Sequence, residues 1–275
     1  MDKTSFMYYY NYKLQIKLYQ IIDCFAKVIN NQKYKNRQYW HIMFAFYIRR
    51  NTMIYVTGDL HGDINRFKDK KIKKLKKNDY LIVCGDFGFI WSGTKKENKV
   101  LKKLGKKKYN ILFIEGCHEN YDLLYNYPQE EWNGGKVRTI SGNLRQLVRG
   151  SIFEIEGKKI FAFGGGQSAD RHIRKEHNTF WEQELPSDEE LINALKNLKN
   201  NNSSVDYIIT HEPPSLLKDY LDIDIELIQT NQLNAAFSQI ADSCKFKMWY
   251  FGKCHKNKIV SKHYHALFDH VAKVD

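Results

Sequence analysis

The chain has 275 residues, of which 43% are hydrophobic, so it can bury a full core and suits one domain with an appendage. Its five cysteines are odd in number and lack paired spacing, which argues against a disulfide scaffold and for a reducing compartment. No uncharged apolar stretch approaches the roughly 20 residues of a membrane span, and no secretory signal pattern opens the chain. We therefore expect a soluble cytoplasmic protein with no membrane partner.

The net charge of +13 raises the hypothesis of a nucleic-acid partner. Residues 1–52 hold nine Lys or Arg against two Asp, and Lys68–Lys77 contains seven lysines in ten residues. Lysine runs of this kind are typical of a solvated helix face. No helix-turn-helix, zinc-finger or RNA-recognition pattern is present. Nucleic-acid binding is therefore the weakest of the functional hypotheses.

Residues 1–52 differ in composition from the rest of the chain. They contain eight tyrosines and no glycine or proline. Apolar residues at helical spacing occur only between Leu14 and Ile29. We expect residues 1–52 to be an appendage, or translated upstream sequence, and residues 53–275 to form the functional domain.

From Met53 onward, predicted strands alternate with predicted helices. Short apolar runs typical of buried strands occupy 53–57, 80–84 and 110–114. Helices are predicted around 64–76, 96–105 and 120–126. This βαβαβ order indicates a largely parallel sheet, with ligands bound at the carboxyl ends of its strands.

The middle of the chain changes to short strands separated by tight turns. These strands are predicted at 137–140, 144–149, 151–156 and 158–163. We expect them to form an antiparallel second sheet, with Glu156 and Gly157 as one hairpin turn.

The last part returns to alternating elements. In chain order we expect helix 187–199, strand 205–209, helix 229–242, strand 247–251 and two closing strands within 257–269. Ser187 and Glu190 form a capping box that begins the first of these helices.

Five apolar runs are each followed by acidic or histidine residues. The motifs are Asp59-Leu60-His61, Gly85-Asp86, Gly116-Cys117-His118-Glu119, Thr210-His211 and Lys253-Cys254-His255. Because the ends of neighbouring strands meet at one edge of a sheet, carboxylates and imidazoles gather there. This mixture of ligands suits manganese, iron or zinc better than calcium.

The order of these motifs resembles that of the calcineurin-like metallophosphoesterases over residues 53–275. The resemblance implies an α/β fold, a four-layer α/β/β/α sandwich of two mixed sheets flanked by helices. The motif Gly85-Asp86-Phe87-Gly88 lacks the Asp-Arg-Gly ending of the protein serine/threonine phosphatases. The chain is more similar to small bacterial and phage phosphoesterases.

The resemblance also implies roles for single residues. The first metal ion would have four ligands that are all present here: Asp59, His61, Asp86 and His255. Asp86 would bridge to a second ion, which His211 would also bind. Cys117 stands where the family has Asn at the second site, and Lys253 stands where it has His. His118 would donate a proton to the leaving-group oxygen, so His118 and Asp86 are the expected catalytic residues.

The two altered positions leave alternatives open. Cys117 is either a small buried thiol left where a ligand was lost, or a thiolate ligand that favours zinc. A charged Lys253 has no lone pair for a metal ion, but its ammonium group can take the place of the second ion. Ser168, Asp170 and Arg171 follow three glycines expected to turn near the site, from which they could touch substrate.

The leading functional hypothesis is the metal-dependent hydrolysis of a phosphomonoester or phosphodiester. The substrate would be a phosphorylated small molecule or a nucleotide. Manganese is the first choice of cofactor, with iron or zinc as alternatives, and the second metal site is in question because of Cys117 and Lys253. The alternative hypothesis is a catalytically impaired relative that binds a phosphorylated ligand or a partner.

Overall fold

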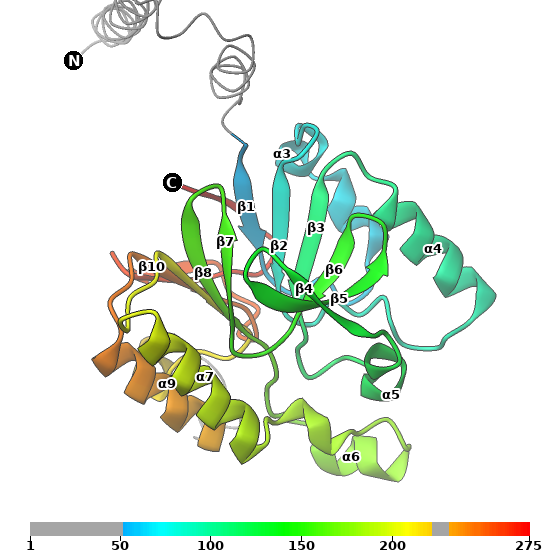
Figure 1. The fold of residues 1–275 in the computed structure, drawn as a ribbon. Coiled ribbons are helices and arrows are strands. Elements are labelled where there is room, and N and C mark those ends of the chain that lie inside the picture. The colour runs from blue at the N-terminus through cyan, green and yellow to red at the C-terminus, as the bar shows by residue number, and fades with distance from the viewer. Residues whose placement is uncertain (1–51, 222–230) are drawn as a thin grey trace, which may run out of the picture. The chain divides into compact units, whose positions relative to one another are not determined.

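The computed structural model describes residues 52–221 and 231–275. The expected appendage, apart from Thr52, lies outside the described residues. Within the described ranges, the strands form a seven-stranded and a six-stranded sheet, and both sheets are mixed. Helices α3 and α4 lie on one side of the sandwich and helices α7 and α9 on the other (Figure 1).

The first sheet has the strand order β13-β1-β2-β3-β6-β5-β4. Its strands are β1 (Ile54–Thr57), β2 (Tyr80–Cys84), β3 (Asn110–Ile114), β4 (Gln129–Trp132), β5 (Gly135–Ser141), β6 (Leu144–Leu147) and β13 (Val271–Val274). Strands β1, β2, β3 and β6 run parallel to one another, and the remaining pairs are antiparallel.

The second sheet has the strand order β11-β12-β10-β9-β8-β7. Its strands are β7 (Ser151–Ile155), β8 (Lys158–Phe163), β9 (Tyr207–Thr210), β10 (Met248–Phe251), β11 (Lys258–Ser261) and β12 (Tyr264–Ala266). Strands β8, β9, β10 and β12 are parallel, so their carboxyl ends lie at one edge of this sheet.

The described α-helices are α3 (Lys70–Lys73), α4 (Lys95–Gly105), α5 (Tyr121–Tyr125), α6 (Arg171–Glu176), α7 (Asp188–Asn200) and α9 (Gln232–Ser243). Short 3-10 helices occupy Ile64–Lys68, Glu182–Glu184 and Ser215–Tyr220. The capping box predicted for α7 is confirmed, because the Ser187 hydroxyl accepts from the Glu190 amide and the Glu190 carboxylate accepts from the Ser187 amide.

The hydrophobic core has three layers, one between the sheets and one beneath each outer layer of helices. Alternate residues of a strand face opposite sides of its sheet. In β2, Ile82 packs between the sheets and Leu81 packs toward the helices. In β8, Ile160 packs between the sheets and Phe161 packs against the cluster that includes α7 and α9. This arrangement confirms the expected four-layer sandwich.

Several predicted elements differ in detail. The middle strands do not form one sheet, because β5 and β6 extend the first sheet whereas β7 and β8 belong to the second. The helix predicted at 64–76 is interrupted at Asp69, whose carboxylate caps α3 instead. Strands β4 and β13 and helix α6 were not predicted. None of the described helices is long and apolar enough to cross a membrane.

Candidate metal centre

The predicted site residues follow the carboxyl ends of parallel strands from both sheets. Asp59 and His61 follow β1, Asp86 follows β2, Cys117 and His118 follow β3, His211 follows β9, and Lys253 and His255 follow β10. The sandwich brings the two sheet edges together, so residues about 200 positions apart meet.

Four of these residues form a compact group of possible metal ligands, namely Asp59, His61, Asp86 and His255. One donor atom from each lies within 4.8 Å of every other. The Nε2 atoms of His61 and His255 are 2.9 Å apart, and His255 Nε2 is 3.2 Å from Asp59 Oδ2. Two carboxylates and two imidazoles are a donor set that fits manganese, iron or zinc.

Asp59 and Asp86 are fully buried, which disfavours a charged carboxylate. Burial would raise both pKa values, but the pKa of Asp86 is held well below its usual range by His211 and His118. Hydrogen bonds with His211 and His255 likewise lower the pKa of Asp59. Both groups are therefore carboxylates at neutral pH and available to a cation.

The backbone at this centre is strained in four places. His61, Asp86, Lys253 and His255 have φ values of 47°, 43°, 67° and 47°. Residues other than glycine rarely adopt this left-handed region, and they persist there only when the surrounding structure holds them. Four of the ten such residues in the described part of the chain lie at this centre, and backbone strain of this kind is common at functional sites.

Two glycines allow the loops to approach the carboxylates closely. A Cβ atom at Gly116 would lie 2.1 Å from Asp86 Oδ1, and one at Gly252 would lie 2.3 Å from Asp59 Oδ1. Neither contact is compatible with a side chain. The glycines preceding Cys117 and Lys253 are therefore needed for the packing of the loops around the ligands.

His118 lies beside the carboxylate group and not within the first cluster. Its amide donates to Asp86 Oδ1 at 2.8 Å, and its Nδ1 lies 2.7 Å from Asp86 Oδ2. Burial opposes the charged imidazole, but hydrogen bonds with Asp86 and Cys117 raise the pKa of His118 to about 10. The ring is thus protonated at neutral pH, and 40% of its side chain is exposed. A protonated, partly exposed imidazole is able to donate a proton.

His211 is fully buried against both carboxylates. Its Nδ1 donates to the Cys84 carbonyl oxygen at 2.9 Å, which leaves Nε2 without a proton when the ring is neutral. Nε2 lies 3.4 Å from Asp86 Oδ1 and 3.8 Å from Cys117 Sγ. His211 is not a member of the first cluster, and although burial opposes its charge, Asp86, Asp59 and Cys117 raise the pKa of His211 well above its usual value.

Asp86, Cys117 and His118 form a second group of possible metal ligands, and a lysine side chain lies against it. Lys253 Nζ lies 3.0 Å from Cys117 Sγ and donates to the Gln167 carbonyl oxygen at 2.7 Å. Burial opposes its charge, but Cys117, Glu212 and Asp86 raise the pKa of Lys253 further above its usual value. An ammonium ion cannot ligate a metal and repels one. Burial and Asp86 disfavour the thiolate form of Cys117, but Lys253 favours it. The pKa of Cys117 is therefore lowered to about 7.

Three residues with no predicted role support the site. Glu119 is buried and accepts a hydrogen bond from the Phe87 amide at 2.6 Å, which fixes the loop after Asp86. Arg66 Nη1 donates to the Asp59 carbonyl oxygen at 2.6 Å. Arg174 Nη1 donates to the Cys117 carbonyl oxygen at 2.7 Å. Glu119 was visible in the motif after His118, whereas the arginines carried no sequence signal.

The glycine-rich loop contributes differently from the expectation. Ser168 is buried, and its hydroxyl donates to the Glu184 carboxylate at 2.8–2.9 Å, so its role is structural. Asp170 and Arg171 lie at the start of α6. The residue of this loop that reaches the site is Gln167, through its carbonyl oxygen.

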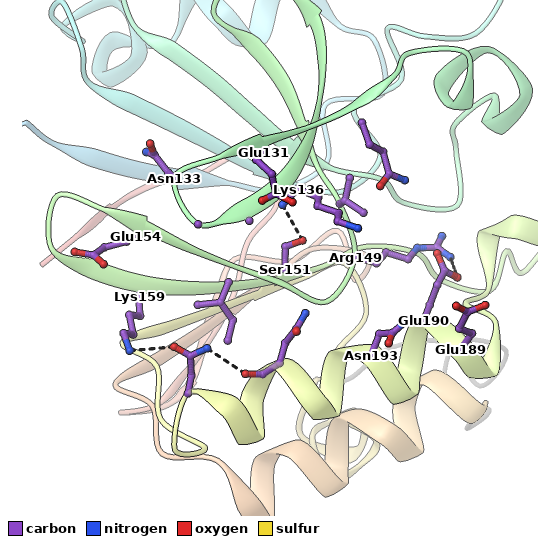
Figure 2. Close-up of a pocket in the computed structure, with 17 residues that line it drawn as sticks. Glu131, Asn133, Lys136, Arg149, Ser151, Glu154, Lys159, Glu189, Glu190 and Asn193 are labelled. Atoms are coloured by element: carbon purple, nitrogen blue, oxygen red, sulfur yellow. Dashed lines mark hydrogen bonds and ion pairs between the residues drawn. The ribbon is translucent and has the colours of Figure 1, made fainter.

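A cavity of about 710 Å³ lies away from the ligand cluster. Figure 2 shows it between the hairpin that carries Glu131 and Lys136 and the helix that carries Glu189, Glu190 and Asn193. Its lining includes none of the predicted site residues. The predicted chemistry therefore belongs to the loops at the sheet edges.

The chain matches one family of known proteins. The calcineurin-like phosphoesterase family matches residues 52–240, more than half of the chain. Lys253 and His255 lie beyond the matched range. The crystal structure of phosphopantetheinyl hydrolase from Mycobacterium tuberculosis is similar, with 14% sequence identity, a TM-score of 0.39, and coverage of 79% of this chain and 89% of that chain. A search of curated proteins found no match.

Proposed function

The chain belongs to the calcineurin-like phosphoesterase family, and we propose that it hydrolyses a phosphate ester with the help of a divalent metal ion. The observation that carries this proposal is the group of two carboxylates and two imidazoles within 4.8 Å of one another. The substrate class is a phosphomonoester or phosphodiester of a small molecule or nucleotide.

The ligands of the ion would be Asp59, His61, Asp86 and His255. Manganese is the metal we favour, and iron and zinc suit the same donors. Such an ion activates water as a nucleophile and neutralises charge on the phosphoryl oxygens. Residues 53–275 would contain this whole centre, with residues 1–52 as an appendage.

His118 would protonate the leaving-group oxygen. Its Nδ1 is engaged with Asp86 at 2.7 Å, so the proton available for transfer is on Nε2. The hydrogen bond with Asp86 would favour the protonated ring. Asp86 would thus serve both as a ligand and as the group that orients the acid.

A second candidate function is the binding of a phosphorylated ligand or partner without hydrolysis. The observation that favours it is the ammonium group of Lys253 beside Cys117, where the family has metal ligands. A protein of this kind would still bind phosphate at the centre, but it would not hydrolyse a phosphate ester.

The two candidates differ in turnover. Protein stripped by a chelator and reloaded with manganese should hydrolyse an aryl phosphate or a bis(aryl) phosphate, and the stripped protein should not. At saturating manganese, His118→Gln should reduce turnover by about 100-fold or more.

His263→Gln is the matched control, because His263 is exposed and contacts the Lys247 carbonyl oxygen outside the cluster. Its turnover should equal that of the parent. Manganese and phosphate binding without hydrolysis of either ester class would reject the enzyme and support the binding function.

A further inference from the structure

Three donor groups beside the first cluster converge on one position. Cys117 Sγ lies 3.9 Å from Asp86 Oδ2 and 3.8 Å from His211 Nε2, and His211 Nε2 lies 3.4 Å from Asp86 Oδ1. A carboxylate, an imidazole and a thiol so arranged form a place for a cation. The ammonium group of Lys253 lies 3.0 Å from one of these donors, Cys117 Sγ.

Lys253 is held in this position from both ends. Its Nζ donates to the Gln167 carbonyl oxygen at 2.7 Å, and its amide lies 3.1 Å and 3.2 Å from the carboxylate oxygens of Asp59. Its φ of 67° is maintained although it is unfavourable for lysine. One residue therefore joins the first cluster through its backbone and the second position through its side chain.

An ammonium group has three N–H donors, and two of those of Lys253 are directed at Cys117 and Gln167. The third can be offered to an anion. A phosphoryl group bound at the first cluster would lie near this charge, because Cys117, which the ammonium group contacts, lies 3.9 Å from Asp86 of that cluster. Lysine binds phosphate as a point charge.

We propose that the Lys253 ammonium group replaces the second metal ion, so that the protein binds one divalent ion per chain and Lys253 supplies the other positive charge to the phosphoryl oxygens. This inference rests on the proposed function for the first cluster. In this account Lys253 supplies a positive charge to the substrate, and Cys117 helps to hold its ammonium group in place.

The test is the number of manganese ions per chain, measured by elemental analysis and calorimetric titration. The parent protein should bind one ion. The double variant Cys117→Asn, Lys253→His supplies an amide oxygen and an imidazole in place of the ammonium, so it should bind two. Lys253→Arg keeps the charge and should still bind one.

A second measurement does not depend on rebuilding the site. Calorimetry should show that Lys253→Met weakens the binding of inorganic phosphate to the manganese-loaded protein by about tenfold. Lys262→Met, which removes a charge from the exposed turn between β11 and β12, should leave phosphate binding unchanged.

The outcomes separate the inference from the proposed function. Two ions in the parent protein, one ion in the folded double variant, or unchanged phosphate affinity in Lys253→Met would each overturn the role of Lys253 and leave ester hydrolysis standing. A parent protein that binds no manganese and hydrolyses no ester would overturn the proposed function, and the inference with it.

Discussion

Gly116 is a position where the structure predicts a large effect from one methyl group. In Gly116→Ala the added Cβ would lie 2.1 Å from Asp86 Oδ1 and 2.3 Å from the Asp86 amide nitrogen. Rotation of the Asp86 side chain cannot relieve the second contact, because it is made by backbone. The ligand or its loop must therefore move by roughly 1 Å, whereas metal–ligand distances tolerate about 0.2 Å.

We expect two measurable consequences of Gly116→Ala. Overpacking of this kind costs about 1–3 kcal/mol, so the unfolding midpoint of the metal-free protein should fall by roughly 2–12 °C. Manganese affinity should fall by about 10–100-fold, the loss typical when groups that orient a ligand are disturbed. Calorimetric titration and thermal unfolding measure the two effects.

Gly157→Ala provides the control for Gly116→Ala. Gly157 has a φ of 73° in the β7–β8 turn, and a Cβ there would meet nothing within 4 Å. Its substitution tests the left-handed backbone alone and should cost about 1–2 kcal/mol with no change in manganese affinity. If Gly116→Ala bound manganese as tightly as the parent, the close approach of Gly116 would not position Asp86, and the reasoning would be refuted.

Three further predictions concern the ligands, the appendage, and an ion pair between the buried side chains of Arg149 and Glu115. Asp86→Ala should abolish manganese binding more completely than His211→Ala, because Asp86 belongs to the first cluster and His211 does not; equal losses in titration would contradict these roles. Arg149→Met leaves the Glu115 carboxylate buried without its cation, so unfolding should be easier by about 3–5 kcal/mol, with Lys262→Met as the neutral control; a loss below about 1 kcal/mol would contradict this account. Removal of residues 1–52 should lower the unfolding midpoint by less than about 8 °C, and a larger fall would show that the appendage is integral to the fold.

The sequence was sufficient to predict the strands that carry the ligands. Strands such as β2 and β9 are buried on both faces, so each appears as a continuous apolar run that ends where a motif begins. Helix α7 was also predictable, because its capping box is formed by residues three positions apart, Ser187 and Glu190. These features depend on residues close together in the chain.

Partner choice between strands was not predictable in the same way. Alternation in β5 and β7 reveals which face is buried, but the burial pattern does not identify the neighbouring strand. Strand β4, with the sequence Gln-Glu-Glu-Trp, lacks an apolar pattern. Strand β13 is four residues long and forms only by pairing with β1.

In the candidate site, too, features that depend on local motifs were predictable and features that depend on contacts between loops were not. The four residues of the first cluster were predicted to lie together because each belongs to a motif, and the structure brings them together. The contacts of Lys253 with Cys117 and Gln167 were not predictable, since they depend on the direction of one side chain between two loops. Arg174 was missed for the same reason.

The pairing of β1 with β13 also constrains the order of folding. Ile54 pairs with Val274 and Thr57 with Val271, so the strand that leads to Asp59 and His61 acquires one of its two neighbours from the end of the described chain. A ribosome that adds roughly 5–20 residues per second needs about 10–45 s to make the intervening segment. During that time β1 has an open edge, which is prone to pair with other chains. We therefore expect the metal centre to be completed only after synthesis of β13, and nascent chains to depend on protection of this edge until then.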